Sequence, residues 1–150
     1  MKLAVASDHA GFLLKQRVIE GLRQAGHDIT DLGTHSTEPV DYPDYARAIA
    51  EAVLNRRAER GILICGSGAG ACVAANKFRG IRAATCHDCF SARQCVEDDD
   101  VNVLCLGACV IGAELAWELV RHYLQARFSG AERHRRRLQK VAAFEAEFGK

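Results

Sequence analysis

The glycine-rich stretch at residues 62–71, ILICGSGAGA, constrains the fold of this chain more than any other feature. An apolar run ends at Cys65 and enters a turn with three glycines in five residues, and a helix-forming segment at residues 72–77 follows. This order predicts a strand, a tight turn and a helix. Such a turn exposes backbone N–H groups without intervening side chains, and the following helix adds its positive end. We therefore expect a site for negative charge beside the Cys65 thiol, in a setting that favours the thiolate.

Short apolar segments alternate with helical patterns along the whole chain. The strands are expected at residues 2–6, 27–32, 61–65, 81–86 and 103–106. The helices are expected between Phe12 and Gly26, where the glycine ends the pattern, and at residues 45–57, 70–78, 91–97, 113–128 and 131–148. Strands that alternate with helices predict an α/β fold with a parallel sheet covered on both faces, here with an extra amphipathic helix at the C-terminus.

Length and composition are those of one domain spanning residues 1–150. The chain is 49% hydrophobic and 26% charged, which is enough apolar content for a sizeable core. Its net charge of +1 supplies no general field for nucleic acid or anionic lipid. The first apolar run is too short for a signal peptide because Asp8 and His9 interrupt it, and no run reaches membrane-spanning length. Seven cysteines, an odd number, fit reduced thiols, so we expect a cytoplasmic protein without nucleic-acid or membrane partners.

Polar residues follow the predicted strands at their carboxyl ends. In parallel α/β sheets these ends lie along one edge, which is where ligands bind. The rule brings together Asp8 with His9, the loop at residues 33–44, the turn at 65–70, His87 with Asp88, and residues 107–109. The loop contains both prolines and is long for a compact domain, which also favours a functional role.

The glycine turn alone admits three interpretations. Residues 66–71 satisfy the dinucleotide fingerprint G-x-G-x-x-G/A, and Asp88 lies about 20 residues further on, where a ribose-binding acid is expected. The same turn could hold a small anion or an oxyanion on its amides, with Cys65 as a participating thiol. A tight turn with a buried thiol and no function is the third interpretation.

Other clusters also have a chemical and a bland interpretation. Residues 97–100, EDDD, could coordinate Mg²⁺, but adjacent acids in a loop are usually only solvated. Residues 86–89, CHDC, superficially resemble a zinc site but lack a second cysteine pair, so no metal is expected. Arg133 and Arg137 share one helix face and could grip a phosphate, within a basic run that includes His134. The remaining thiols are expected to be small core residues: Cys72, Cys105 and Cys109.

Five features, in order along the chain, match the motifs of a known family. They are ASDHAG at residues 6–11, DYP at 41–43, CGSGAG at 65–70, AANKFRGIRA at 74–83, and Arg133 with Arg137. The sequence therefore resembles the ribose-5-phosphate isomerase B and galactose-6-phosphate isomerase family over nearly its whole length. This resemblance disfavours the dinucleotide interpretation. It implies a three-layer α/β/α sandwich with a five-stranded Rossmann-like sheet.

The resemblance also implies an aldose–ketose isomerase that acts on a sugar phosphate through an enediolate, without metal or organic cofactor. Its active sites would combine two subunits of a homodimer, which could pair into a homotetramer. Cys65 would be the base, since Ala71 occupies the position of a glutamate that another branch uses instead, and Ser67 would handle the hydroxyl proton. The enediolate oxygen would be stabilised by the amides of Gly66, Gly68, Ala69 and Gly70. The hydroxyls would be positioned by Asp8, Tyr42 and Asn102, and the phosphate would be bound by His9, Arg133 and Arg137.

Two departures from the family pattern concern the substrate. The family usually has His-Asn-Asp where this chain has Asp98, Asp99 and Asp100, and the histidine opens the furanose ring. It also usually has an arginine for the phosphate where this chain has Cys109. With ribose 5-phosphate as the default substrate, the ring would be opened by Asp98 or Asp99, or would open spontaneously. A tetrose 4-phosphate needs no ring opener, because its C4 hydroxyl carries the phosphate. The chain could also be a hexose 6-phosphate isomerase, or a non-catalytic module that binds a nucleotide or sugar phosphate.

Overall fold

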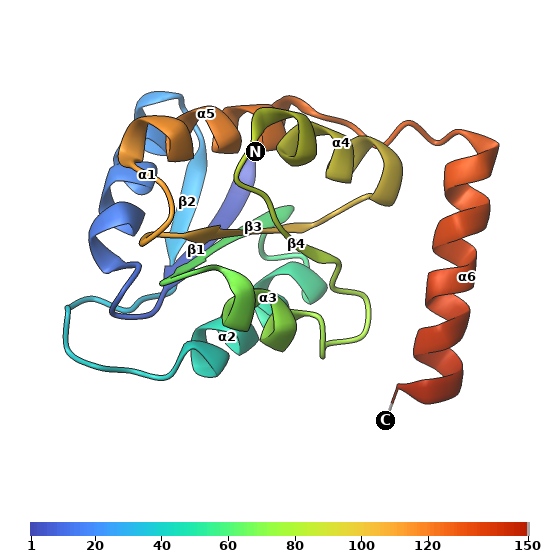
Figure 1. Ribbon diagram of the computed structural model, residues 1–150, viewed down its shortest axis with the longest axis horizontal. Coiled ribbons are helices and arrows are strands. Elements are labelled where there is room, and N and C mark those ends of the chain that lie inside the picture. The colour runs from blue at the N-terminus through green and yellow to red at the C-terminus, as the bar shows by residue number, and fades with distance from the viewer. Residues whose placement is uncertain (150) are drawn as a thin grey trace.

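Five parallel strands form one sheet in the computed structural model, which describes residues 1–149 (Figure 1). The strands are β1 (Lys2–Ser7), β2 (Asp28–Asp31), β3 (Arg60–Cys65), β4 (Ala83–Thr85) and β5 (Val103–Gly107). Their order across the sheet is β2-β1-β3-β5-β4, and every neighbouring pair is parallel. The carboxyl ends of β3 and β5 are level, because Cys65 pairs with Gly107.

Helices cover both faces of this sheet, so the predicted three-layer α/β/α sandwich is confirmed (Figure 1). They are α1 (Phe12–Gln24), α2 (Tyr42–Leu54), α3 (Ala69–Ala75), α4 (Cys89–Asp99), α5 (Ala113–Gln125) and α6 (Glu132–Phe148). The core on one face contains residues of α1, α4 and α5, and the core on the other face contains residues of α2 and α3. The last helix, α6, stands beside this body rather than on the sheet.

The strands show why two cores form. Successive side chains of a strand point to opposite faces, and in β3 both faces are apolar. Ile62 and Ile64 belong to the core under α1 and α5, whereas Leu63 and Cys65 belong to the core under α2 and α3. The face that α2 and α3 cover is therefore the one that receives the Cys65 thiol.

Two element boundaries differ from the prediction in ways that affect the site. The helix α2 begins at Tyr42 rather than at residue 45, because Pro43 lies in its first turn, where a missing N–H leaves no helical hydrogen bond unmade. The preceding loop therefore ends at Asp41. The helix α4 begins at Cys89 rather than at residue 91, since the Asp88 carboxylate caps it by accepting the N–H of Ser91 at 2.7 Å.

The end of α1 agrees with the prediction. Gly26 follows the helix with a φ of +81° and donates its N–H to the carbonyl of Arg23.

Within residues 1–149, none of the helices is both long enough and apolar enough to cross a membrane.

Candidate active site

Backbone contacts join the loops at the carboxyl edge of the sheet. The N–H of Asp8 donates to the carbonyl of Ile64 at 3.2 Å, which fixes the loop after β1 against β3. The N–H of Ala108 donates to the carbonyl of Cys65 at 2.8 Å, and that of Gly107 donates to His87 Nε2 at 2.9 Å. The prediction that these segments share one edge is confirmed.

The turn after β3 wraps around the Cys65 sulfur. The N–H of Gly68 donates to Cys65 Sγ at 3.1 Å, and the side chain is only 5% exposed. Gly68 has a φ of +84°, and a Cβ there would lie 2.9 Å from Thr85 Cγ2. Only glycine adopts this conformation without strain, so the turn depends on it to aim its N–H at the thiol.

Ser67 and Ala69 form a second contact inside the turn. The N–H of Ala69 donates to Ser67 Oγ at 3.2 Å, and the Ser67 side chain is exposed. Two of the four amides predicted to stabilise an oxyanion, those of Gly68 and Ala69, thus have partners within the turn itself. A ligand oxygen that approached the turn would compete with the Cys65 sulfur and the Ser67 hydroxyl for these donors.

Three other predicted site residues lie beside the turn or on the loops next to it. Asp8 is 7% exposed, and its Oδ1 accepts the N–H of Gly11 at 3.0 Å. His9 Nδ1 lies 3.1 Å from the nitrogen of Val40, which attaches the imidazole to the loop before α2. The ring of Tyr42 covers Gly70, since a Cβ on that glycine would meet the ring at 2.9 Å.

Sequence reasoning missed the buried lysine that supports this loop. Lys15 is 0% exposed, and its ammonium contacts Asp31 Oδ1 at 2.5 Å and the carbonyl of Thr34 at 2.7 Å. Asp31 in turn accepts the N–H of Gly33 at 3.0 Å. A lysine within the apolar stripe of α1 was the available signal, because a buried cation needs a partner.

The remaining predicted residues lie at the other end of the strands. Within one chain, α4 runs back from the carboxyl edge, so that Asp98 and Asp99 reach the opposite edge, where β5 begins. Asn102 also lies there, where it accepts the N–H of Arg82 at 2.8 Å and donates to the carbonyl of Gly80 at 2.9 Å. The structure therefore does not bring these side chains to the Cys65 turn of the same chain.

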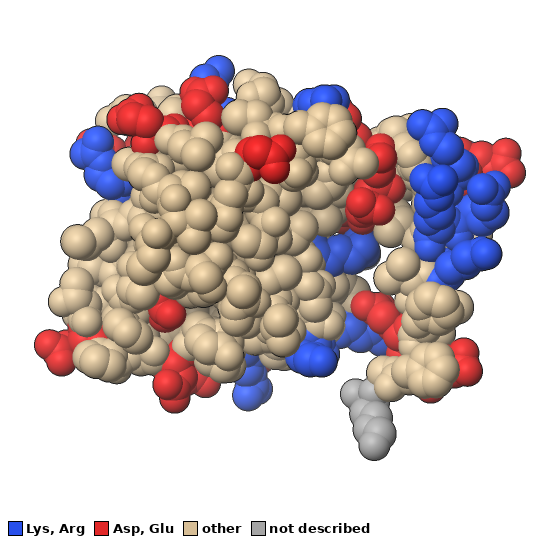
Figure 2. All heavy atoms as spheres, in the orientation of Figure 1, with Lys and Arg blue, Asp and Glu red and all other residues tan. Residues whose placement is uncertain are grey.

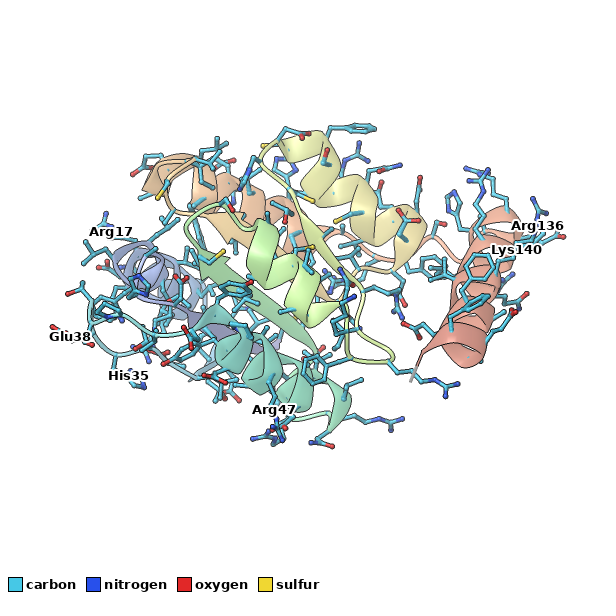
Figure 3. All side chains as sticks on the ribbon, turned by 60° about the horizontal axis from the view of Figure 1, so that its bottom comes forward. Arg17, His35, Glu38, Arg47, Arg136 and Lys140 are labelled. Carbon is cyan, nitrogen blue, oxygen red and sulfur yellow. The ribbon has the colours of Figure 1, made fainter. Side chains whose placement is uncertain are left out.

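Arg133 and Arg137 belong to the first half of α6, where Lys and Arg side chains gather (Figure 2). Figure 3 shows Arg136 and Lys140 of this helix on the opposite side of the molecule from His35 and Glu38, which lie in the loop next to the turn. The basic cluster and the Cys65 turn are thus separate surfaces of one chain.

The thiols divide into buried and accessible groups. The expectation of a core residue holds for Cys105, which is 0% exposed, but is wrong for Cys109, which is exposed. Cys109 leaves the core because it follows β5 in a turn at the edge, with its Sγ 3.9 Å from where a Cβ on Gly66 would stand. Cys72 is partly buried, and a hydrogen bond from the Cys105 thiol lowers its pKa to about 6.

The residues of the dinucleotide and zinc motifs have structural roles. Asp88, the expected ribose-binding acid of a dinucleotide site, caps α4. In the CHDC segment, Cys86 is a core residue and His87 accepts a backbone N–H. Among residues 1–149, no three His, Cys, Asp or Glu side chains form a group that could hold a metal ion.

Comparison with known proteins gives consistent matches over most of the chain. The model of the Ribose/Galactose Isomerase family matches residues 3–141. Ribose-5-phosphate isomerase B of Escherichia coli is 43% identical over 144 residues, which cover 96% of each protein. D-erythrulose-4-phosphate isomerase of Pectobacterium atrosepticum is 42% identical over 131 residues, covering 87% of this chain and 86% of that protein. The structure of Clostridium thermocellum ribose-5-phosphate isomerase B superposes with a TM-score of 0.97 at 43% identity, covering 99% of both chains.

Proposed function

Because this chain belongs to the Ribose/Galactose Isomerase family, and is thus an aldose–ketose isomerase, we propose that it interconverts ribose 5-phosphate and ribulose 5-phosphate. Relatives from several organisms carry the name of this activity. The observation that carries the proposal is the Cys65 thiol at the carboxyl edge of the sheet, with the N–H of Gly68 donated to its sulfur. A base next to preorganised N–H donors is what proton transfer beside a carbonyl requires.

The Cys65 thiolate takes the proton from C2 of the open-chain aldose. The electron pair of that C–H bond forms the C1–C2 double bond, and the π pair of the C1 carbonyl moves onto O1, which gives an enediolate. The same thiol then returns the proton to C1. Ser67 transfers the hydroxyl proton between O2 and O1, so the reaction needs no external oxidant or reductant. The developing oxyanion takes over the N–H donors of the turn, from Gly66, Gly68, Ala69 and Gly70.

Residues around the turn bind the rest of the sugar. The Asp8 carboxylate and the Tyr42 hydroxyl position the substrate hydroxyls, and Tyr42 already lies over Gly70. His9 binds the phosphate from the side of the loop before α2. In this proposal the carboxyl edge of one chain holds the base, the oxyanion donors and the residues that position the substrate hydroxyls.

A second copy of the chain supplies the other half of each site. Five of the proposed site residues lie away from the Cys65 turn of their own chain, so their roles need a partner chain. They are Asp98, Asp99, Asn102, Arg133 and Arg137. In a two-fold symmetric homodimer each chain gives its carboxyl edge to one site and its α6 to the other. The apolar side chains of α6 support such an interface: Val141 is 46% exposed, Phe144 60% and Phe148 72%. Two such dimers could pair into a tetramer.

A tetrose 4-phosphate is a second candidate substrate, favoured by the state of Asp98. Its Oδ2 accepts a hydrogen bond from Gln94 at 2.7 Å, and its Oδ1 lies 3.5 Å from His134 Nε2. A carboxylate whose Oδ2 already accepts a hydrogen bond is a poor ring opener, and a tetrose 4-phosphate has no furanose ring to open. The Pectobacterium relative is named for such a substrate.

Steady-state turnover of three substrates by the purified protein tests these proposals: ribose 5-phosphate, erythrulose 4-phosphate and a hexose 6-phosphate. The highest kcat/KM on ribose 5-phosphate supports the main proposal, and a clear preference for erythrulose 4-phosphate supports the second. Loss of turnover in Cys65→Ala, with sugar-phosphate binding retained, supports the thiol as the base. Thermal stabilisation by NADH without turnover of any sugar phosphate would contradict both.

A further inference from the structure

A buried histidine joins α6 to α4 and to the segment between α5 and α6. His134 is 3% exposed, although it lies in the most basic part of the chain. Its Nδ1 lies 2.7 Å from Ser129 Oγ, and its Nε2 lies 3.1 Å from Arg133 Nε and 3.5 Å from Asp98 Oδ1. Both ring nitrogens therefore have partners.

The arginine determines the tautomer of this imidazole. The Nε of Arg133 can only donate a hydrogen bond, so Nε2 of His134 must accept it and must carry no hydrogen. A neutral His134 then carries its hydrogen on Nδ1 and donates it to Ser129 Oγ. The Ser129 oxygen also accepts the N–H of Ala131 at 3.2 Å, which holds the hydroxyl in place.

This bond leaves one edge of the guanidinium free for a ligand. With Nε committed to His134, the two terminal nitrogens of Arg133 remain as a planar fork on an exposed side chain. A fork held in this way matches two oxygens of a phosphate and has lost part of its rotamer entropy before binding. Arg133 is therefore preorganised in the free chain.

We propose that neutral His134 is a positioning residue that holds Arg133 for the substrate phosphate and releases it on protonation. The proposal rests on the phosphate-binding role of Arg133 in the proposed function. A protonated Nε2 cannot accept from Arg133 and instead donates toward Asp98 Oδ1, which Gln94 keeps within 3.5 Å. Asp98 of α4 and Arg133 of α6 are the charged groups that contact the ring. The N–H of Ser129 donates to the backbone carbonyl of Glu97, whose carboxylate is paired with Arg93 at 2.7 Å.

Two substitutions separate the two bonds of His134. In His134→Gln the terminal oxygen takes the place of Nε2 and still accepts from Arg133. In His134→Asn the shorter amide takes the place of Nδ1 and reaches only Ser129. We expect a KM close to that of the wild type for the Gln variant and about a tenfold higher KM for the Asn variant, with kcat changed much less in both. Equal KM values in the two variants would overturn the proposal.

Inhibition by inorganic sulfate reports the protonation step, because sulfate keeps its charge while a sugar phosphate titrates. When the pH is lowered until His134 is protonated, the Ki of the wild type should rise relative to that of His134→Gln. The ratio of the two Ki values removes the contribution of His9, which both proteins share. A ratio that is constant with pH would contradict the release of Arg133.

Nitrogen NMR of His134 gives a readout that needs no turnover. At pH 8 we expect the hydrogen on Nδ1 in the wild type, and a loss of that preference in Arg133→Met, which removes the donor to Nε2. The opposite tautomer in the wild type would overturn the proposal even if the enzyme is active. A protein with the expected tautomer that turns over no sugar phosphate would instead count against the proposed function, so the two failures are distinguishable.

Discussion

The geometry of Gly68 predicts that a single methyl group at this position damages both stability and catalysis. In Gly68→Ala, the φ of +84° costs roughly 1–2 kcal/mol for a residue with a Cβ. The new Cβ would also stand 2.9 Å from Thr85 Cγ2 and 3.2 Å from the carbonyl carbon of Leu106, and relieving that contact costs about 1–3 kcal/mol. We therefore expect a loss of about 2–5 kcal/mol in the free energy of unfolding.

The backbone displacement that relieves this contact also turns the Gly68 N–H away from the Cys65 sulfur and from the proposed oxyanion. Losing one such donor lowers kcat by roughly 10²–10³ in other enzymes, and we expect an effect of that order here. KM should change little, because the phosphate-binding residues lie elsewhere.

Gly26→Ala is the matched control for this prediction. Its φ of +81° is nearly the same, but no atom lies within 4 Å of the point where its Cβ would stand, and it is at the end of α1, away from the site. It should lose only the conformational part, about 1–2 kcal/mol, with kcat unchanged. Urea unfolding and initial-rate measurements on both variants test this. Equal losses of stability, or an undiminished kcat in Gly68→Ala, would refute the reasoning.

Three further predictions concern separate parts of the structure. A mixture of Cys65→Ala chains with chains lacking both Arg133 and Arg137 should regain activity after unfolding and refolding together, up to about a quarter of the wild-type value, because half the dimers then hold one intact site; no recovery would contradict shared sites. Lys15→Met should lower the free energy of unfolding by about 3–5 kcal/mol, since it leaves Asp31 without its cation, and the double variant Lys15→Met/Asp31→Leu should recover part of that loss in urea unfolding. The Cys72 thiol, with its pKa lowered to about 6 by the Cys105 hydrogen bond, should lose its proton as the pH rises through that value, so its alkylation rate should level off well below pH 9. Mass spectrometry of Cys72 checks this, and a rate that still rises steeply at pH 9 would contradict it.

The local pattern of the chain was sufficient for the sandwich and for the residues of the candidate site that follow its strands. Apolar strands separated by amphipathic helices admit few arrangements, and parallel strands bring the residues after them to one edge. Asp8, His9 and the Cys65 turn could therefore be placed together from their positions in the sequence alone. The glycines of that turn were equally informative, since a left-handed residue packed against β5 tolerates no side chain.

The tertiary structure decided which residues are separated and which are buried, because these depend on contacts between segments distant in sequence. Because α4 runs back to the opposite edge, Asp98 lies away from the Cys65 turn of its own chain, and so does Asn102, which follows the helix. Arg133 lies away from that turn because α6 stands beside the body. Periodicity along α6 could not show that His134 is buried, since that burial comes from Ser129 and from Asp98 on another helix. A sequence pattern reports the faces of each element, whereas the partners of a face appear only when the elements are packed.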